Sequence, residues 1–401
     1  MDSVNEAHDQ RLEVADQRLN DYLGRVRAIA PLIREQAALA ERDSELTPAV
    51  AEAFHASGLY RILLPADMDG GDLTIPESLR IYEETASIDG SAGWNLAICS
   101  GGPIFGTLVT PEVFRKIFGD RRAVAVGSLN PTSQAVPVDG GFRFSGRATY
   151  ASGCAQATWL MANGIVLTNG QPQIVDGMPA MRVGLFPIKE AKILQTWSVS
   201  GMRGTGSNDC VFENVFVPEQ FTYEAFTARP KWDRGAFSNI PLLVLLGGSL
   251  AAVALGVARH AIEALKTIAM AKVPAASRST LRERPLAQMQ IGQAEGLLGA
   301  ARAYLYQSNE ETWRKGQRNE EFDLMARAEA RLASVTAAKL AAQAVDLVYD
   351  AGGLTSIQTA RDIERCWRDA HTITQHITLS TGRYEVVGRI LLGLNPENPI
   401  V

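Results

Sequence analysis

The first third of the chain carries apolar residues at helical spacing. Residues 11–42 are rich in charge, and apolar residues recur there every three or four positions: Leu19, Leu23, Val26, Ile29 and Leu32. This period predicts an amphipathic helix with one buried face. Helix-start signals recur further along, where a cap residue or an acidic residue stands next to proline or glycine. They predict helices from Thr47-Pro48 to about Gly58, from Pro76 to Ala86, and from Asp89 towards Gly101.

From about Ala123 the pattern changes to short apolar runs separated by Gly, Pro, Asn and Asp, which is typical of strands. The runs lie at 124–126, 142–144, 159–167 and 183–186. From about Ser238 a helical period returns, most clearly at Val335, Ala338, Ala342, Val345 and Tyr349. This order predicts an α+β protein with a β module between two helical domains, which we place at 1–122, 123–232 and 233–401.

One apolar run, residues 240–258, meets the length rule for a membrane helix, since Ser249 is its only polar residue. It is rich in Gly and Ala, has Pro241 near its start, and continues without a break into the charged residues Arg259, His260, Glu263 and Lys266. We therefore predict the start of a long buried helix in a soluble protein.

Charge and cysteine content narrow the class of protein. A formal net charge of −5 without a Lys/Arg block argues against a nucleic-acid or anionic-membrane partner. The cysteines are far apart, and no CxxC pair or Cys/His spacing suits zinc: Cys99, Cys154, Cys210 and Cys366. We expect free thiols, no metal site and a cytoplasmic protein. The polar N-terminal segment does not have the pattern of a signal peptide.

Residues 197–218, WSVSGMRGTGSNDCVFENVFVP, combine a glycine-rich turn with a strand pattern. The turn runs from Gly201 to Ser207, and the valines at 211, 215 and 217 follow before Pro218. Glycines let a backbone approach a ligand closely and offer it their amides. Such turns are also common without a ligand, so the pattern by itself predicts only a turn.

Further candidate residues lie in two polar stretches of the β module. ATYASGC, residues 148–154, follows a hairpin around 139–141 and contains Tyr150 and Ser152. GSLNP, residues 127–131, stands at the start of the module and contains Ser128 and Leu129. A serine hydroxyl both donates and accepts hydrogen bonds, which suits a ligand that changes protonation. The alternative for 148–154 is an ordinary polar strand end.

The run from Arg361 to His376 contains two of the five histidines of the chain. His371 and Gln375 would share a helix face at i, i+4 spacing, with His376 one residue further round. A neutral imidazole can take a proton from a phenol, or hydrogen-bond an indole or another substrate. The alternative for each histidine is a capped, half-buried side chain near a helix end.

Taken together, these motifs resemble the acyl-CoA dehydrogenase superfamily from about residue 20 to 396. More narrowly, they resemble the oxygenase components of two-component flavin monooxygenases, a group that includes 4-hydroxyphenylacetate hydroxylase, dibenzothiophene monooxygenase and indole hydroxylases. The supporting pieces are DGSAGWN at 89–95, Ser152, Trp197 with GMRGTGS, and Arg368-Asp369 with His376. The resemblance implies an N-terminal helical domain, a central β-barrel or sandwich, a C-terminal four-helix bundle, and a homotetramer.

The resemblance also implies contacts with a flavin. Tyr150 and Ser152 match residues beside flavin N5, and Ser128 and Leu129 match the pyrimidine side. The other implied flavin contacts are Trp197, Arg203, Gly204, Thr205, Arg278, Gly352 and Gly353. Of these, Gly352-Gly353 would touch the flavin tail of a neighbouring subunit, although by itself the pair is a helix C-cap. Arg278 would pair with a phosphate. The Phe-Gly that usually follows this arginine is absent, which leaves FAD and FMN both open.

An acyl-CoA dehydrogenase is the main alternative, and the base that it needs distinguishes the two. A dehydrogenase requires a carboxylate to remove the proton α to the thioester. Most of the superfamily has this base in a Glu-Gly-Thr shortly after the C-terminal Arg-Asp, where this chain has His376-Ile377-Thr378. The other known place, residues 235–258, contains no Asp or Glu. The resemblance therefore favours a monooxygenase.

The implied reaction is hydroxylation of a small phenol- or indole-type aromatic substrate by O2, through a flavin C4a-hydroperoxide. Reduced flavin would come from a separate NAD(P)H:flavin reductase, and no strand–GxGxxG–helix unit for NAD(P)H stands out in this chain. Ser152 would steady N5, and His376 would activate or orient the substrate in a pocket lined by Trp94, Asn95 and His371. An oxygenase acting on nitrogen or sulfur, and a non-catalytic protein of the same fold, are the remaining alternatives.

Overall fold

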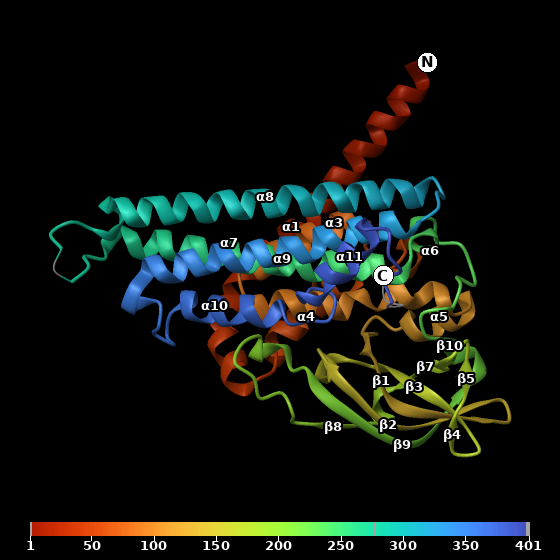
Figure 1. Cartoon of the computed structure of the whole chain (residues 1–401). Helices are drawn as coiled ribbons and strands as arrows, with labels where there is room; N and C mark the ends of the chain where they lie inside the picture. The colour runs from red at the N-terminus through yellow and green to blue at the C-terminus, as the bar shows by residue number, and fades with distance from the viewer. Residues whose placement is uncertain (1, 276, 398–401) are drawn as a thin grey trace.

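The computed structural model describes residues 2–275 and 277–397, with side chains from residue 16 onward (Figure 1). The helices of its N-terminal part are α1 (Asp2–Asp43), α2 (Pro48–Ala56), α3 (Ile75–Ala86), α4 (Gly90–Gly101) and α5 (Pro111–Phe118). Their starts have clear causes. Thr74 and Glu77 form a capping box on α3, and Asp89 Oδ1 accepts the Ala92 amide at 2.9 Å to cap α4.

The middle of the chain forms a sheet that lies beneath the helices in Figure 1. Its strands follow the order β10-β7-β3-β1-β2-β9-β8, with β4 added beside β3, while β5 and β6 form a separate hairpin. The bounds are β1 (Ala125–Val138), β2 (Gly141–Ala151), β3 (Trp159–Thr168), β4 (Gln171–Pro172), β5 (Ile174–Val175), β6 (Met178–Pro179), β7 (Met181–Pro187), β8 (Lys192–Leu194), β9 (Asn208–Pro218) and β10 (Thr222–Glu224). The β module, which was expected to be a barrel or a sandwich, thus consists mainly of one eight-stranded sheet.

Two breaks in strand register occur at the end of the sheet that faces α4. The pairing of β1 with β3 shifts between Ser128 and Ser133. The pairing of β2 with β9 shifts between Ala148 and Ala151. At such bulges, backbone groups leave the ladder and become available to other partners. Both breaks fall on stretches that the sequence singled out.

The C-terminal part consists of long helices: α6 (Ala236–Asn239), α7 (Leu242–Ala271), α8 (Pro285–Gln317), α9 (Leu324–Gly352), α10 (Asp362–Ile373) and α11 (Gly382–Leu391). Helices α7, α8, α9 and α10 pack together as a bundle, and α11 packs on α9. The face of α9 that contains Ala333, Ala337 and Ala341 is fully buried, because alanine lets neighbouring helices approach closely. The predicted order of helices, sheet and helices is confirmed.

Among the described residues, α7 is the helix with the length and apolarity of a membrane span. However, 78% of its most apolar 18-residue window is buried. It packs against α3 and α4 on one side and against the bundle on the other. As predicted, α7 is a core helix.

One expectation about the C-terminal helices is wrong. Helix α10 ends at Ile373, so Gln375 does not share its face with His371. Thr374 Oγ1 donates to the carbonyl oxygen of His371 at 2.8 Å, a local bond that competes with continuation of the helix. His376 therefore lies in the turn after α10, where it faces a different part of the molecule.

One large hydrophobic core runs through all three parts of the chain, beside a small cluster between α9 and α11. The large core includes Phe54 near α2, Phe144 in the sheet and Val253 in α7, each essentially without exposed surface. Because all three parts contribute side chains to this core, it fixes the sheet and both sets of helices relative to one another. The residues discussed below lie where the three parts meet.

Candidate active site

Ser152 lies where the sheet, α4 and the glycine-rich turn meet. It follows β2 directly, and the next residue, Gly153, has φ 72°; a Cβ there would stand 2.5 Å from Cys99 Sγ. The chain can therefore turn beneath α4 only with glycine at this position. Trp94 Nε1, from α4, donates to Ser152 Oγ at 3.1 Å, and Ser207 Oγ lies 2.6 Å away on the other side. Ser152 is buried and held by both neighbours.

The hydroxyl groups beside Ser152 form a chain whose direction follows from counting hydrogens. Thr205 Oγ1 donates to the Met202 carbonyl at 2.8 Å, so it must accept from Ser207 at 2.7 Å. The single hydroxyl hydrogen of Ser207 is then used, and Ser152 must donate to Ser207. Because Ser152 also accepts from Trp94, its oxygen keeps one lone pair with no partner among the described residues. Ser152 is thus a fixed hydrogen-bond acceptor.

His376 packs against the same tryptophan. Its ring meets the Trp94 indole edge-on, with 5.4 Å between centroids. Burial, together with the positive charge of Arg331, lowers the pKa of His376 to about 4. At neutral pH the imidazole is therefore uncharged.

The tautomer of His376 follows from its contacts with Thr378. The Thr378 amide donates to Nδ1 at 3.3 Å, and Thr378 Oγ1 lies 2.8 Å from the same nitrogen. Nδ1 is then the acceptor, and the proton of the neutral ring is on Nε2. No acceptor among the described residues is bonded to Nε2. His376 accordingly offers an N–H donor beside Trp94.

The glycine-rich turn is held from behind by the C-terminal Arg-Asp pair. The Met202 amide donates to the Asp369 carboxylate, and Met202 has φ 56°. Burial raises the pKa of Asp369 to about 7, and the bond from Met202 partly opposes this. Arg368 donates to the Ser200 carbonyl and pairs with Glu41 at 2.6 Å. These contacts join α10 and α1 to the turn that supplies Thr205 and Ser207.

The turn residues assigned to a cofactor by resemblance serve visible packing roles. A Cβ on Gly204 would stand 3.0 Å from Ser91 Cβ and 3.1 Å from Ala40 Cβ, so glycine permits contact with α4 and α1. Thr205 is fully buried within the hydroxyl chain, and Arg203 Nε lies 3.9 Å from Glu41. Gly204 and Thr205 thus form the rear of the site.

Two aromatic side chains in contact, Tyr150 and Trp197, form an exposed aromatic edge, and Tyr150 is close to Ser152 in the chain. Tyr150 is 65% exposed and has φ 57°, a conformation that is uncommon for a residue with a Cβ. Its ring meets Trp197 at 6.3 Å, and Trp197 Nε1 donates to the Met202 carbonyl at 3.0 Å. Backbone strain at an exposed aromatic residue is typical of a ligand-binding position.

The first bulge of β1 adjoins this edge. Ser128 is buried, its Oγ accepts the Asn130 amide at 3.2 Å, and Leu129 is half-buried. The Leu129 carbonyl accepts from Asn163 Nδ2 at 2.8 Å. Asn130 Nδ2 reaches Thr149 Oγ1 at 3.3 Å, so the bulge and the strand before Tyr150 are in contact. The structure therefore brings Ser128, Leu129, Tyr150, Ser152 and Trp197 to one surface region.

Two residues expected to line the substrate pocket are directed elsewhere. Asn95 is fully buried: Tyr60 donates to its Oδ1 at 2.8 Å, and its Nδ2 donates to Gln156 at 3.2 Å. His371 bonds Asp346 at 2.8 Å and packs on Trp367 on the outer side of α10. The expected roles of Asn95 and His371 receive no support, because both side chains already have partners outside the group around Ser152.

Arg278, Gly352 and Gly353 lie away from this group, at the end of the bundle where α7 leaves and α9 ends. Lys272 Nζ donates to the Gly352 carbonyl at 2.5 Å, which joins the loop after α7 to the end of α9. Gly353 has φ 54° and is exposed, as is Arg278. Within one chain they are not brought to Ser152.

Two residues of the site were missed from the sequence. Ser207 orders the hydroxyl chain, although its position in a glycine-rich turn gave no separate signal. Arg331 lies four residues before Val335, on the apolar stripe that predicted α9. A charge on a buried stripe is the signal that could have identified it.

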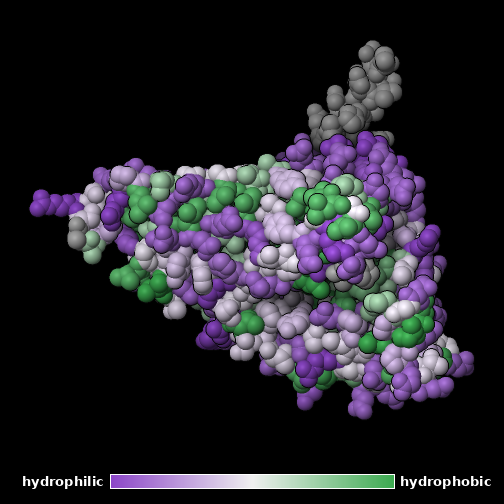
Figure 2. Space-filling model, in the orientation of Figure 1, coloured by the Kyte–Doolittle hydropathy of each residue, from purple (hydrophilic) through white to green (hydrophobic). Residues whose placement is uncertain are grey.

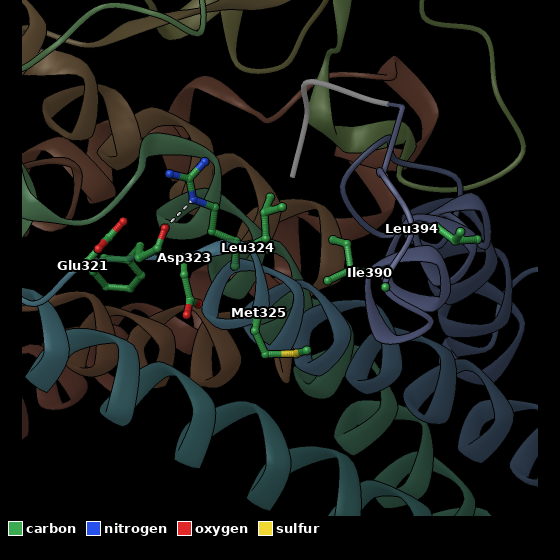
Figure 3. A pocket seen from close by; sticks show the side chains of 9 residues that line it. Glu321, Asp323, Leu324, Met325, Ile390 and Leu394 are labelled. Carbon is green, nitrogen blue, oxygen red and sulfur yellow. Dashed lines mark hydrogen bonds between the residues drawn. The ribbon is translucent and has the colours of Figure 1, made fainter.

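A separate surface cleft of about 630 Å³ opens between the start of α9 and the end of α11 (Figure 3). Leu324, Met325, Ile390 and Leu394 line it, with Glu321 and Asp323 near its edge. None of the residues expected to bind flavin or substrate lines this cleft, and it is not the candidate active site.

Comparison with known proteins identifies the class. The family model for the acyl-CoA dehydrogenase C-terminal domain matches residues 249–381. Indole-3-acetate monooxygenase of Pseudomonas putida is 32% identical over 367 residues, which cover 91% of this chain and 92% of that protein. The oxygenase component of the FADH2-dependent resorcinol hydroxylase of Rhizobium sp. (strain MTP-10005) is 26% identical over 393 residues, covering 94% and 95%. The crystal structure of 3-HSA hydroxylase from Rhodococcus sp. RHA1 matches with a TM-score of 0.85 at 25% identity, covering 95% of this chain and 99% of that one.

The fold and the site thus define a protein of the acyl-CoA dehydrogenase type. Within that class, the chain belongs to the oxygenase components of two-component flavin-dependent monooxygenases. The residues present fit a flavin: an exposed aromatic edge, a strand bulge and a fixed hydroxyl acceptor lie together.

Proposed function

We propose that this monooxygenase hydroxylates a small phenol- or indole-type aromatic substrate, using O2 and reduced FAD or FMN. The observation that carries the proposal is the grouping of Ser152, Trp94 and His376, in which a fixed acceptor and a neutral N–H donor both contact one indole ring. By their names, the two relatives above act on indole-3-acetate and resorcinol, which are both small aromatic compounds.

Ser152 is proposed to position the cofactor. Its remaining lone pair suits an N–H donor, and reduced flavin carries such a group at N5. When bound, the reduced flavin supplies the electrons that activate O2. Tyr150 and Trp197 would cover the ring, and the bulge at Ser128 and Leu129 would offer its backbone groups. Arg203, Gly204 and Thr205 would support the turn from behind.

His376 is proposed to orient the substrate through its Nε2–H, with Trp94 as the adjoining wall. A group with a pKa near 4 is a weak base at neutral pH, so donation of a hydrogen bond is favoured over removal of a proton. Acyl-CoA oxidation receives no support, because a neutral imidazole stands where the dehydrogenase base is expected. Helix α7 also carries no Asp or Glu before Arg259.

We further propose that a separate NAD(P)H:flavin reductase supplies the reduced flavin, and that the enzyme is a cytoplasmic homotetramer. Apolar side chains gather in patches on the helical part (Figure 2). Leu286 and Met289 of α8 are exposed, and so are Leu354 and Ile357 beside Gly353. Burial of such residues against another copy of the chain is a common use of exposed apolar surface. Gly352, Gly353 and Arg278 would then reach a neighbour's flavin.

The proposed function is tested with chemically reduced FAD or FMN and 18O2. The full chain is mixed with a panel of phenols and indoles, and products are identified by mass spectrometry. One 18O atom in a hydroxylated aromatic product is the expected result. Oxidation of the flavin without any labelled product across the panel would contradict aromatic hydroxylation. Reduction of oxidised flavin by an acyl-CoA would point to the dehydrogenase instead.

A further inference from the structure

Arg331 is a buried cation in the middle of α9. The residue is 5% exposed, and both terminal nitrogens of its guanidinium are buried without a hydrogen-bond partner among the described residues. No Asp or Glu of the described chain forms an ion pair with it. Buried charges in proteins are nearly always paired, because transfer from water is costly. The terminal nitrogens of Arg331 therefore lack the anionic or hydrogen-bonding partner that a buried guanidinium normally has.

A second arginine close to Arg331 adds to the unfavourable electrostatic energy of its buried charge. Arg383, on α11, is 8% exposed, and its charge together with burial lowers the pKa of Arg331 to about 10. Arg331 nevertheless remains charged at neutral pH. Two like charges in one buried region repel each other, and an anion bound to Arg331 would offset that repulsion.

Arg331 is connected to the active site through His376. Its charge is felt by His376, whose ring packs on Trp94, and Trp94 donates to Ser152. His376 offers its Nε2–H in the same region. Arg331 lies close enough to His376 for its charge to lower the pKa of that imidazole, and the hydrogen-bonding groups left without a partner on the two side chains are both donors. This pattern selects an acceptor with negative charge.

We propose that Arg331 binds the carboxylate of the substrate, so that the enzyme acts on an aromatic carboxylic acid rather than on a neutral phenol or indole. The inference rests on the proposed function and names its substrate class. The two free terminal nitrogens of a guanidinium form a planar fork that matches the two oxygens of a carboxylate. With the carboxylate held at Arg331, the aromatic ring would extend along Trp94 towards Ser152.

The test compares two ligands of nearly the same shape, indole-3-acetate and indole-3-acetamide, of which only the first carries a negative charge and two acceptor oxygens. Binding to the full chain is measured by calorimetry, with and without flavin, and hydroxylation is measured separately. The wild-type protein is expected to bind the acid about ten- to hundredfold more tightly than the amide, as for a buried charged hydrogen bond. Arg331→Met should abolish this preference by weakening the acid alone, and Arg331→Lys should retain part of it.

A matched control is Arg327→Met, one turn earlier on α9, where the guanidinium already donates to the Phe322 carbonyl at 2.8 Å. This variant should keep the preference for the acid. Equal binding of acid and amide by the wild-type protein, or equal weakening of both by Arg331→Met, would overturn the proposal. So would Arg331-dependent binding of inorganic phosphate as tight as that of the acid, since the site would then hold free anions only.

The two proposals fail in different ways. Arg331-dependent binding of the acid without any hydroxylated product would leave the carboxylate site intact and disprove the hydroxylation of this class. Hydroxylation of neutral aromatics, unchanged in Arg331→Met, would leave the proposed function intact and disprove the carboxylate site.

Discussion

Two buried polar regions, the hydroxyl chain at Ser152 and the guanidinium of Arg331, differ in whether their hydrogen-bonding groups have partners. In the hydroxyl chain from Ser152 to Met202, every hydroxyl hydrogen has an acceptor within the protein, and the Ser152 oxygen keeps one lone pair without a partner among the described residues. At Arg331, both terminal nitrogens lack a partner among the described residues. A satisfied network fixes the position of its members, whereas an unsatisfied charge destabilises the fold until a ligand completes it. This contrast agrees with the two proposed roles, positioning of the cofactor by Ser152 and recognition of an anion by Arg331.

The largest expected effect is the loss of the fixed acceptor. Ser152→Ala should lower the rate of product formation about 100-fold, which is typical of removing one preorganised hydrogen-bonding group. Ser207→Ala leaves the Ser152 oxygen bonded to Trp94, so its rate should fall by about tenfold at most. Single-turnover product analysis with reduced flavin measures both variants, and circular dichroism checks their fold. Equal losses in the two variants would show that the chain acts as a unit and that Ser152 has no separate role.

A smaller and opposite effect is expected for stability at Arg331. Arg331→Met should raise the free energy of unfolding in the absence of ligand by about 1–4 kcal/mol, because it replaces an unpaired buried charge with an apolar side chain of similar length. Chemical denaturation at neutral pH measures the change. Removing a structural arginine would instead lower stability, so a clear decrease would place Arg331 in the scaffold. Arg327→Met, with its satisfied side chain, is the reference variant.

The smallest effect is a pair of opposed pH dependences. His376 has a pKa of about 4 instead of the ordinary 6.5, so the unfolded chain binds more protons between these values, and stability falls as pH decreases from about 6.5 to 4. Asp369 has a pKa of about 7 instead of 3.8, so the folded chain binds more protons, and stability falls as pH rises from about 4 to 7.

Two variants separate these contributions. His376→Gln should reduce the loss of stability that accompanies a decrease in pH from about 6.5 to 4. Asp369→Asn should reduce the loss of stability that accompanies an increase in pH from about 4 to 7. Unfolding midpoints measured across this range decide the question. An Asp369→Asn profile that keeps the loss above pH 4 would show that another group is responsible.

The sequence was informative wherever one local rule determined the outcome. Pro48 begins α2 because proline fits the first turn of a helix, and Asp89 begins α4 because its side chain caps the Ala92 amide. The apolar run before Arg259 became the core helix α7, since its continuation into charged residues is typical of a long amphipathic helix. The end of α10 was missed, because the bond from Thr374 to the backbone decides it and periodicity does not show that bond.

Site residues were harder to predict, because the type of a residue does not show where its side chain points in the folded protein. Asn95 and His371 have the chemistry of a substrate contact, but each is bonded to other side chains, Tyr60 and Asp346. The sequence shows Arg331 as a charged residue on an apolar stripe, but its electrostatic environment depends on α11 and on the turn that contains His376. These neighbours are distant in sequence and are brought together by packing alone.

The sequence by itself determined the class of this protein, the order of its helices and strands, and the stretches that contain Ser152, Trp197 and His376. The order of helices and strands follows from periodicity, capping and turn chemistry, which act over a few residues, whereas the class was expected from the resemblance of motifs to a known family. Only the tertiary structure decided that Trp94, Ser152 and Ser207 share hydrogen bonds, that His376 carries its proton on Nε2, and that the terminal nitrogens of Arg331 are buried without a partner among the described residues. Each of these depends on burial and on partners from separate elements, because hydrogen-bond geometry and charge energetics are set by the neighbours that folding supplies.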